Sequence, residues 1–154
     1  MVVLKKALFI DRDGTIIKDI PYSADAGRIE IYHDAVELMK RYSGEGYLIV
    51  IITNQSGINR GYFTVQELKI FNDVLIHYLQ NMGVHIDAVY FCPHTPEENC
   101  RCRKPETGMV TAAATDLNID IKNSVMAGDR EDMDGGLAER LGMRFILMKH
   151  EQSE

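Results

Sequence analysis

Long apolar runs are missing from this sequence. No stretch approaches the roughly 18 consecutive apolar residues that a transmembrane helix needs, so we expect no membrane-spanning segment and no membrane partner. A secretory signal is also missing, because Lys5 and Lys6 follow the first apolar residues and no small-residue cleavage site comes after them. These absences predict a cytoplasmic protein.

Cysteine is scarce, and basic residues are the minority among the charged ones. The three cysteines, Cys92, Cys100 and Cys102, are an odd number in one short stretch, which makes a poor disulfide framework. A reducing compartment disfavours disulfides as well. Lysine and arginine total 17 against 23 acidic residues, a formal charge of −6. A dedicated nucleic-acid binder usually has a basic domain, so this charge argues against nucleic acid as a partner.

The sequence does have the material for a hydrophobic core. Its 154 residues suit one domain, and 45% of them are hydrophobic. Short apolar runs alternate with helical patterns, and most runs lack polar alternation, as strands buried on both faces do. The predicted strands cover residues 7–10, 47–52, 88–91, 124–127 and 144–148.

Helix signals fill the intervals between these runs. Asp34 with Glu37, and Thr64 with Glu67, have the spacing of a capping box at a helix start. The predicted helices run from Asp34 to about residue 42, from Thr64 to Gly83, from Thr107 to about 117, and from about 134 to 141. Alternating strands and helices imply right-handed βαβ units and a parallel sheet covered on both faces.

The predicted fold class is therefore α/β. We expect a single Rossmann-like three-layer α/β/α domain with a mainly parallel sheet over residues 1–150, and a frayed tail at 151–154. Four histidines lie away from the predicted strand ends and are interpreted as solvated or capping residues: His33, His77, His85 and His150.

Polar residues follow the predicted strands where each strand ends. Asp11 and Asp13 follow the first strand, Thr53 follows the second, and Asp129 follows the fourth. Parallel strands end at the same edge of a sheet, and ligands bind there. Crowded carboxylates repel one another, and a few of them with substrate phosphate oxygens suit magnesium better than a calcium cage. A solvated turn at residues 11–14 is the alternative.

These residues resemble the motifs of the haloacid dehalogenase superfamily of phosphohydrolases. Residues 11–15 resemble its first motif, Thr53 the second, Lys104 the third, and Asp129 with Asp134 the fourth. Within the superfamily, residues 53–57, 92–94 and 100–105 resemble the histidinol-phosphate and heptose-1,7-bisphosphate phosphatase group. The resemblance covers about residues 7–148.

The resemblance implies an aspartyl-phosphate mechanism. Asp11 is the expected nucleophile, Asp13 the general acid and base, Thr53 a phosphate-binding residue, and Lys104 the transition-state stabiliser. Magnesium is expected at Asp11, Asp129 and the main-chain carbonyl of Asp13. Asp134 and Asp132 compete for the supporting acid of the fourth motif, and helix length favours Asp134.

The expected substrate is a small phosphorylated sugar, with D-glycero-D-manno-heptose 1,7-bisphosphate first. The first alternative is a phosphatase that acts on histidinol phosphate or on a broad range of small metabolites. The second alternative is a non-catalytic zinc-stabilised binding module. No cap domain fits between the motifs, so loops at residues 18–28, 57–63 and 92–102 form the roof of a monomeric enzyme. The candidate substrate contacts are Asn54, Gln55, Ser56, Arg103, Arg130 and Tyr22.

The stretch from Cys92 to Cys102 offers three sulfurs and one imidazole. Cys92, His94, Cys100 and Cys102 are the ligand types of a closed structural zinc site, and the resembled group shows this arrangement. Free thiols with a surface histidine are the alternative. Zinc binding would organise the loop, because binding energy in such a site is folding energy.

Overall fold

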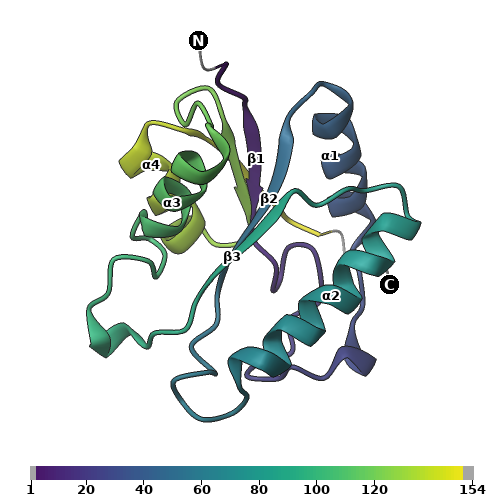
Figure 1. The fold of residues 1–154 in the computed structure, drawn as a ribbon, viewed down its shortest axis with the longest axis vertical. Helices are drawn as coiled ribbons and strands as arrows, with labels where there is room; N and C mark the ends of the chain where they lie inside the picture. The colour runs from purple at the N-terminus through teal and green to yellow at the C-terminus, as the bar shows by residue number, and fades with distance from the viewer. Residues whose placement is uncertain (1–2, 151–154) are drawn as a thin grey trace.

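A computed structural model of the chain describes residues 3–150, which form an α/β domain around one parallel sheet (Figure 1). Within these residues the sheet has five strands in the order β3-β2-β1-β4-β5, and each neighbouring pair is parallel. The strands are β1 (Ala7–Ile10), β2 (Leu48–Asn54), β3 (Ala88–Cys92), β4 (Val125–Gly128) and β5 (Arg144–Leu147). The predicted parallel sheet is confirmed.

Helices cover both faces of the sheet. The α-helices of the described residues are α1 (His33–Gly44), α2 (Val65–Asn81), α3 (Gly108–Leu117) and α4 (Gly136–Leu141). Figure 1 shows α1 and α2 on one side of the strands and α3 and α4 on the other. Short 3-10 turns lie at Ala26–Arg28 and Pro96–Glu98, and a π-helical turn lies at Glu131–Gly135.

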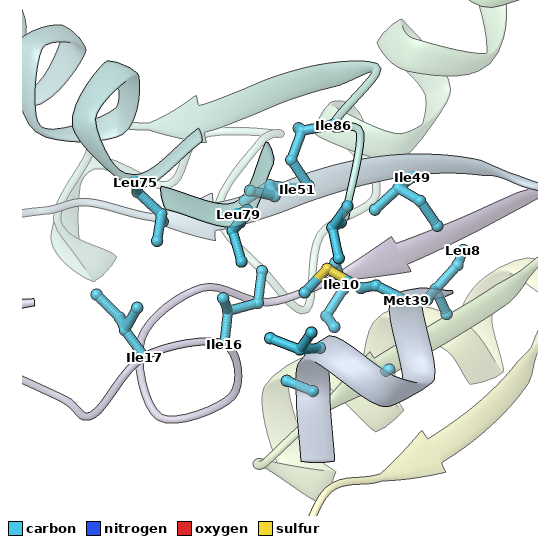
Figure 2. Close-up of a cluster of buried hydrophobic side chains, with 14 of the residues drawn as sticks. Leu8, Ile10, Ile16, Ile17, Met39, Ile49, Ile51, Leu75, Leu79 and Ile86 are labelled. Carbon is cyan, nitrogen blue, oxygen red and sulfur yellow. The ribbon is translucent and has the colours of Figure 1, made fainter. Parts of the chain in front are cut away.

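The core is divided between these faces by the alternation of side chains along each strand. Leu8 and Ile10 of β1, with Ile51 of β2, pack toward α1 and α2, as Figure 2 shows. Phe9 of β1 and Val50 of β2 pack on the opposite face, where α3 and α4 lie. Burying one such side chain contributes about 1.5–3 kcal/mol to stability. Burial on both faces explains why the strands read as continuous apolar runs.

The capping box predicted for α2 is confirmed, and the one predicted for α1 is wrong. Thr64 accepts a hydrogen bond from the Glu67 N–H at 3.1 Å, and Glu67 accepts one from the Thr64 N–H at 3.0 Å. Helix α1 starts one residue earlier than expected, and its N-cap has no side-chain hydrogen bond. The Asp34 carboxylate instead contacts His150 at 2.8 Å.

The last helix starts later than predicted. The π-helical turn occupies the interval where a helix was expected to begin at Asp134. The Asp134 side chain points back toward the sheet, where it accepts a hydrogen bond from Lys104 at 2.8 Å. Among the helices of residues 3–150, none has the length and apolar character needed to cross a membrane. The predicted tail at 151–154 lies outside the described residues.

Candidate active site

A cleft of about 290 Å³ opens at the carboxyl edge of the sheet. It is the place where ligands bind in open parallel sheets. Its walls contain most of the predicted site residues: Asp11, Asp13, Tyr22, Asn54, Gln55, Ser56, Arg103, Lys104, Asp129, Arg130 and Asp134. Thr53 is the exception, because its side chain is fully buried below the cleft and accepts a hydrogen bond from Gln55 at 2.8 Å.

A buried charge cluster, formed by Asp11, Lys104 and Asp134, lies at the base of the cleft. These residues are 7%, 3% and 1% exposed. The Lys104 ammonium donates to Asp11 at 2.7 Å, to Asp134 at 2.8 Å and to the carbonyl of Ile52 at 3.0 Å. An ammonium group has three donors, so the protein uses all of them. The lysine is thus fixed beside the β1 carboxylate.

Burial and neighbouring charge act in opposite directions within this cluster. Burial raises the pKa of Asp11 well above its ordinary value, and Lys104 only partly offsets it. For Lys104, burial lowers the pKa, but the carboxylates of Asp11 and Asp134 outweigh burial and raise it. Lys104 therefore keeps its charge. A further cation beside Asp11 would favour the ionised carboxylate.

Carboxylate oxygens of Asp11, Asp129 and Asp134 lie within 4.8 Å of one another. The Thr15 hydroxyl lies 3.3 Å from Asp11 and 3.1 Å from Asp129, and links the ends of β1 and β4. Gly14 adopts φ +83°, and a Cβ there would lie 2.4 Å from Asp129. A side chain at this position would displace Asp129. Oxygen donors of this kind fit the hard cation Mg²⁺.

The structure brings Asp134, and not Asp132, to this carboxylate group. Asp134 also accepts a hydrogen bond from the backbone N–H of Arg130 at 3.2 Å. Both of its oxygens therefore have protein partners, so it can position Lys104 without binding a metal itself. Asp132 is exposed and pairs with the Arg130 guanidinium at 2.6 Å, which lowers its pKa.

The Asp13 carboxylate is held from two sides. Arg12 donates to it through two nitrogens, at 3.0 and 3.1 Å, and Gln55 donates at 2.8 Å. The Arg12 guanidinium is itself buried, hydrogen-bonded to Asn72 at 2.8 Å and stacked 4.4 Å from the centre of the Phe71 ring. The sequence interpretation gave Arg12 no role. Arg12 lies between Asp11 and Asp13 in the sequence, and this position could have indicated its role in holding a carboxylate.

Asn54 links the cleft to the third motif. Its side chain accepts a hydrogen bond from the Lys104 N–H at 3.0 Å and donates to the Lys104 carbonyl at 3.3 Å. These contacts set the backbone from which the Lys104 side chain extends. Asn54 therefore supports the site through the backbone of Lys104, and its contact with substrate stays a prediction.

The rim of the cleft carries aromatic and cationic side chains. Tyr22, which adopts φ +55°, stacks on Tyr62 with ring centres 4.9 Å apart. The Arg60 guanidinium lies 5.4 Å from the Tyr22 ring and donates to Ser56 at 3.1 Å. Burial lowers the pKa of Arg103, and the positive charge of Arg60 lowers it further. The rim thus concentrates positive charge, and Arg60 and Tyr62 were not among the predicted contacts.

Asp19 is a further residue that the sequence interpretation missed. It lies at the rim and lines the cleft. Partial burial raises the pKa of Asp19, and the carboxylates of Asp13 and Asp129 raise it further. No local sequence pattern distinguishes Asp19 from other exposed acids in the loop after β1.

The cysteine loop, residues 92–102, brings its four predicted ligands together. Ligand atoms of Cys92, His94, Cys100 and Cys102 lie within 4.8 Å of one another. The structure pairs Cys92 with Cys102 as a disulfide, whereas we expected none. Their Cα atoms are 5.7 Å apart, and this closeness permits a disulfide. The Cys100 sulfur lies 3.5 Å from that of Cys92, so the same geometry gathers three sulfurs for a metal.

His94 is also tied to the neighbouring loop. Its Nδ1 contacts Glu98, and Asn59 donates to both Glu98 oxygens at 3.0 Å. Asn59 belongs to the segment at residues 57–63 that follows β2. Two of the segments expected to roof the cleft are therefore connected through one asparagine.

The interpretation of His150 as a solvated or capping residue is wrong. Its side chain is only 16% exposed, and its Nε2 lies 2.9 Å from the Gly14 carbonyl in the first motif. No pattern near His150 predicts this contact, because it joins residues 136 positions apart.

Comparisons with known proteins agree with the cleft geometry. The HAD-hydrolase-like family model matches residues 101–154. A Thermoplasma acidophilum protein named "Probable D-glycero-D-manno-heptose-1,7-bisphosphate 7-phosphatase" is 48% identical over 145 residues, covering 94% of this chain and 91% of that protein. The D-glycero-beta-D-manno-heptose-1,7-bisphosphate 7-phosphatase of Helicobacter pylori (strain J99) is 40% identical over 152 residues, covering 97% of this chain and 87% of that protein.

A solved structure is similar over nearly the whole fold. The D,D-heptose 1,7-bisphosphate phosphatase from B. bronchiseptica, complexed with magnesium and phosphate, matches with a TM-score of 0.83 and 29% identity. The match covers 92% of this chain and 79% of that one. These similarities show that the chain is a phosphatase of the haloacid dehalogenase-like (HAD-like) class. Within that class, the chain belongs to the family of heptose-1,7-bisphosphate phosphatases.

Proposed function

We propose that this protein hydrolyses a phosphate monoester of D-glycero-D-manno-heptose 1,7-bisphosphate with the help of magnesium. The observation that carries the proposal is the Asp11 carboxylate, held at the tip of β1 beside Lys104 and close to Asp129. A carboxylate in this position can act as a nucleophile, and the adjacent cation offsets the charge of an approaching phosphate.

Magnesium fits the donor set at the carboxyl edge. Asp11 and Asp129 would hold it with the main-chain carbonyl of Asp13, while Asp134 supports Lys104 from the other side. When bound, the ion shields the charge of the phosphoryl oxygens and so lets an anionic nucleophile approach.

The reaction then proceeds in two displacements at phosphorus. An Asp11 oxygen attacks, the bond from phosphorus to the sugar oxygen breaks, and the leaving oxygen takes a proton from Asp13. A water molecule, deprotonated by Asp13, next attacks the aspartyl phosphate, which releases inorganic phosphate and restores Asp11. Arg12 and Gln55 keep the Asp13 carboxylate in one orientation for both steps. The N–H groups after β2 would bind phosphoryl oxygens, and the buried Thr53 hydroxyl would hold the Gln55 side chain beneath them.

The rim supports a substrate with a second anionic group. Arg103 and Arg130 line the cleft and would grip the distal phosphate through their guanidinium forks, with Tyr22, Gln55 and Ser56 as further contacts. The names of the relatives favour the heptose bisphosphate over histidinol phosphate or a broad range of substrates. Every expected catalytic position is filled, which counts against a non-catalytic zinc-stabilised binding module.

Phosphate release from a panel of phosphorylated metabolites tests the proposal. We expect the heptose bisphosphate to have the highest kcat/KM, with activity dependent on Mg²⁺. Asp11→Asn should reduce kcat by about 10⁴-fold or more, while Asp73→Asn, exposed on α2, should leave it unchanged. Full turnover by Asp11→Asn would exclude the covalent route, and a higher kcat/KM for histidinol phosphate would change the substrate.

We also propose that the cysteine loop binds structural Zn²⁺ through Cys92, His94, Cys100 and Cys102. The closeness of the four ligand atoms supports this, and the Glu98 contact at Nδ1 of His94 leaves Nε2 for the metal. Zinc needs all three thiols reduced. Metal analysis with thiol titration after unfolding should find one zinc and three thiols per chain. One thiol and no zinc would instead support the Cys92–Cys102 disulfide.

Reduced thiols require a reducing compartment, so we propose that the protein acts in the cytoplasm. We also propose that the working unit is a monomer, because Asp11, Asp13 and Lys104 of the same chain already lie together in the cleft. Sedimentation of the zinc-loaded protein tests the oligomeric state, and a dimer at working concentrations would contradict this part of the proposal.

A further inference from the structure

His150 lies where the chain returns to the active site after β5. Nδ1 of its imidazole lies 2.9 and 2.8 Å from the two carboxylate oxygens of Asp34, and Nε2 lies 2.9 Å from the carbonyl of Gly14. The ring also stacks on Tyr32, with ring centres 3.5 Å apart. The imidazole therefore touches both the start of α1 and the turn that follows β1.

Both ring nitrogens face hydrogen-bond acceptors. A carbonyl oxygen only accepts hydrogen bonds, so Nε2 is the nitrogen that donates to Gly14. The contact of Nδ1 with the Asp34 carboxylate holds the ring in the orientation that points Nε2 at Gly14.

The chain segment around His150 bridges the two strands that carry the proposed magnesium ligands. The Met148 N–H donates to the Gly128 carbonyl at 2.8 Å, one residue before Asp129. His150 binds the carbonyl of Gly14, one residue after Asp13. The Gly14 N–H is held as well, by the carbonyl of Ile17 at 2.8 Å.

Gly14 is the point where such a contact can affect the metal site. Its Cα packs so closely on Asp129 that a Cβ would lie 2.4 Å from the carboxylate. The Asp13 carbonyl, a proposed ligand, belongs to the peptide before the Gly14 Cα, and the Gly14 carbonyl belongs to the peptide after it. A shift of the Gly14 Cα would therefore move one proposed ligand and the surface against which another rests.

We propose that His150 is a positioning residue for the magnesium site. It holds the Gly14 carbonyl and so fixes the spacing between the Asp13 carbonyl and the Asp129 carboxylate. This inference rests on the proposed magnesium-dependent reaction. His150 does not line the cleft, so it acts on the metal ligands and not on the substrate.

The test measures Mg²⁺ binding by calorimetry, together with the Mg²⁺ dependence of phosphate release. His150→Ala should weaken Mg²⁺ binding about fivefold to tenfold, at the low end of the effect of outer-shell partners. At saturating Mg²⁺, kcat and the substrate KM should stay within about twofold of wild type. His150→Gln can still donate to Gly14 and should recover most of the affinity. Asp34→Asn removes only the carboxylate that contacts the ring, so its Mg²⁺ affinity should lie between those of His150→Ala and His150→Gln.

His85→Ala is the matched control, because His85 also pairs with an aspartate, Asp87, but on the opposite edge of the sheet. It should leave Mg²⁺ binding unchanged. Equal Mg²⁺ affinity in wild type and His150→Ala would overturn the inference while leaving the proposed function intact. If His150→Ala does not fold, a Mg²⁺ affinity in Asp34→Asn equal to that of wild type has the same consequence. A wild-type protein that neither binds Mg²⁺ nor needs it would overturn both proposals.

Discussion

The charge cluster and the cysteine loop are held together in different ways. Asp11, Lys104 and Asp134 are buried at the carboxyl edge of the sheet and satisfy one another through hydrogen bonds of 2.7–2.8 Å. The cysteine loop contains only one short 3-10 turn between Cys92 and Cys102, and its sulfurs contact one another. Complementary buried charges hold the first region together, whereas sulfur contacts and exposed hydrogen bonds hold the second.

This difference separates catalysis from stability. In a buried cluster whose charged groups are all hydrogen-bonded, the side chains need little rearrangement when a substrate binds. Electrostatic catalysis requires charges that are positioned in advance in this way. A cross-linked loop mainly removes alternative conformations of the segment that it closes. Perturbing the cluster should therefore affect chemistry and global folding together, and perturbing the loop should affect local order first.

Removing the lysine of the cluster is expected to have the largest effect. Lys104→Met keeps the bulk of the side chain but leaves Asp11 and Asp134 buried without their cation. We expect kcat to fall about 10²–10³-fold and the free energy of unfolding to fall by about 3–5 kcal/mol. Steady-state kinetics and urea unfolding measure these effects. Lys122→Met, at an exposed position, is the control, and equal stability of both variants would show that the cluster is not held as described.

Removing zinc is expected to have the next largest effect, and to act through the cysteine loop on the stability of the protein. Stripping the proposed zinc with a selective chelator, with Mg²⁺ present, should lower Tm by about 5–10 °C, which corresponds to about 2–3 kcal/mol for a chain of this size. Omitting Mg²⁺ should lower Tm by less. The reverse order, measured by differential scanning calorimetry, would contradict a structural role for zinc.

Breaking the link between the roof segments should have a smaller effect. Asn59→Ala removes the hydrogen bonds to Glu98 and leaves the charge cluster intact. Because exposed hydrogen bonds contribute about 1 kcal/mol, we expect a twofold to fivefold rise in substrate KM with kcat unchanged. Asn123→Ala removes a comparable exposed contact, to Asp120, far from the cleft and serves as the control. A fall in kcat alone would show that the link acts on the chemistry.

The smallest expected effect lies outside both regions, on β3. Burial and the hydrogen bond to Asp116 raise the pKa of Tyr90 to about 12. The folded state therefore holds this proton more tightly than the unfolded state, and the contribution of Tyr90 to stability is present below pH 10 and lost as pH rises toward 12. The stability difference between wild type and Tyr90→Phe should shrink over that interval in urea unfolding. A difference that grows with pH would contradict the assignment.

Local sequence determined the parts of the site that lie next to strand ends. Asp11, Asp13 and Asp129 could be predicted because a buried parallel strand must end at the ligand-binding edge. The Thr64 capping box could be predicted for a similar reason, since both of its hydrogen bonds are made within one turn. In each case the deciding contact lies within a few residues in the chain.

Contacts between distant segments account for what the sequence did not predict. The spacing of Asp34 and Glu37 predicts a capping box, but the Asp34 carboxylate contacts His150 instead. His150 is 116 positions away, so no local pattern around Asp34 predicts this contact. The helix predicted from Asp134 is delayed by a π-helical turn, because Asp134 is drawn toward Lys104. The choice between thiols and a disulfide in the cysteine loop depends on redox state as well as on geometry.

The order of strands across the sheet has a consequence for how activity is acquired. β1 lies between β2 and β4, so its tip gains its last polar neighbours only when a strand from the final third of the chain inserts beside it. An intermediate in which β4 has not yet paired with β1 lacks Asp129 and Asp134 beside Asp11, so we expect it to be inactive. During refolding, the return of turnover should therefore report the pairing of β4 with β1.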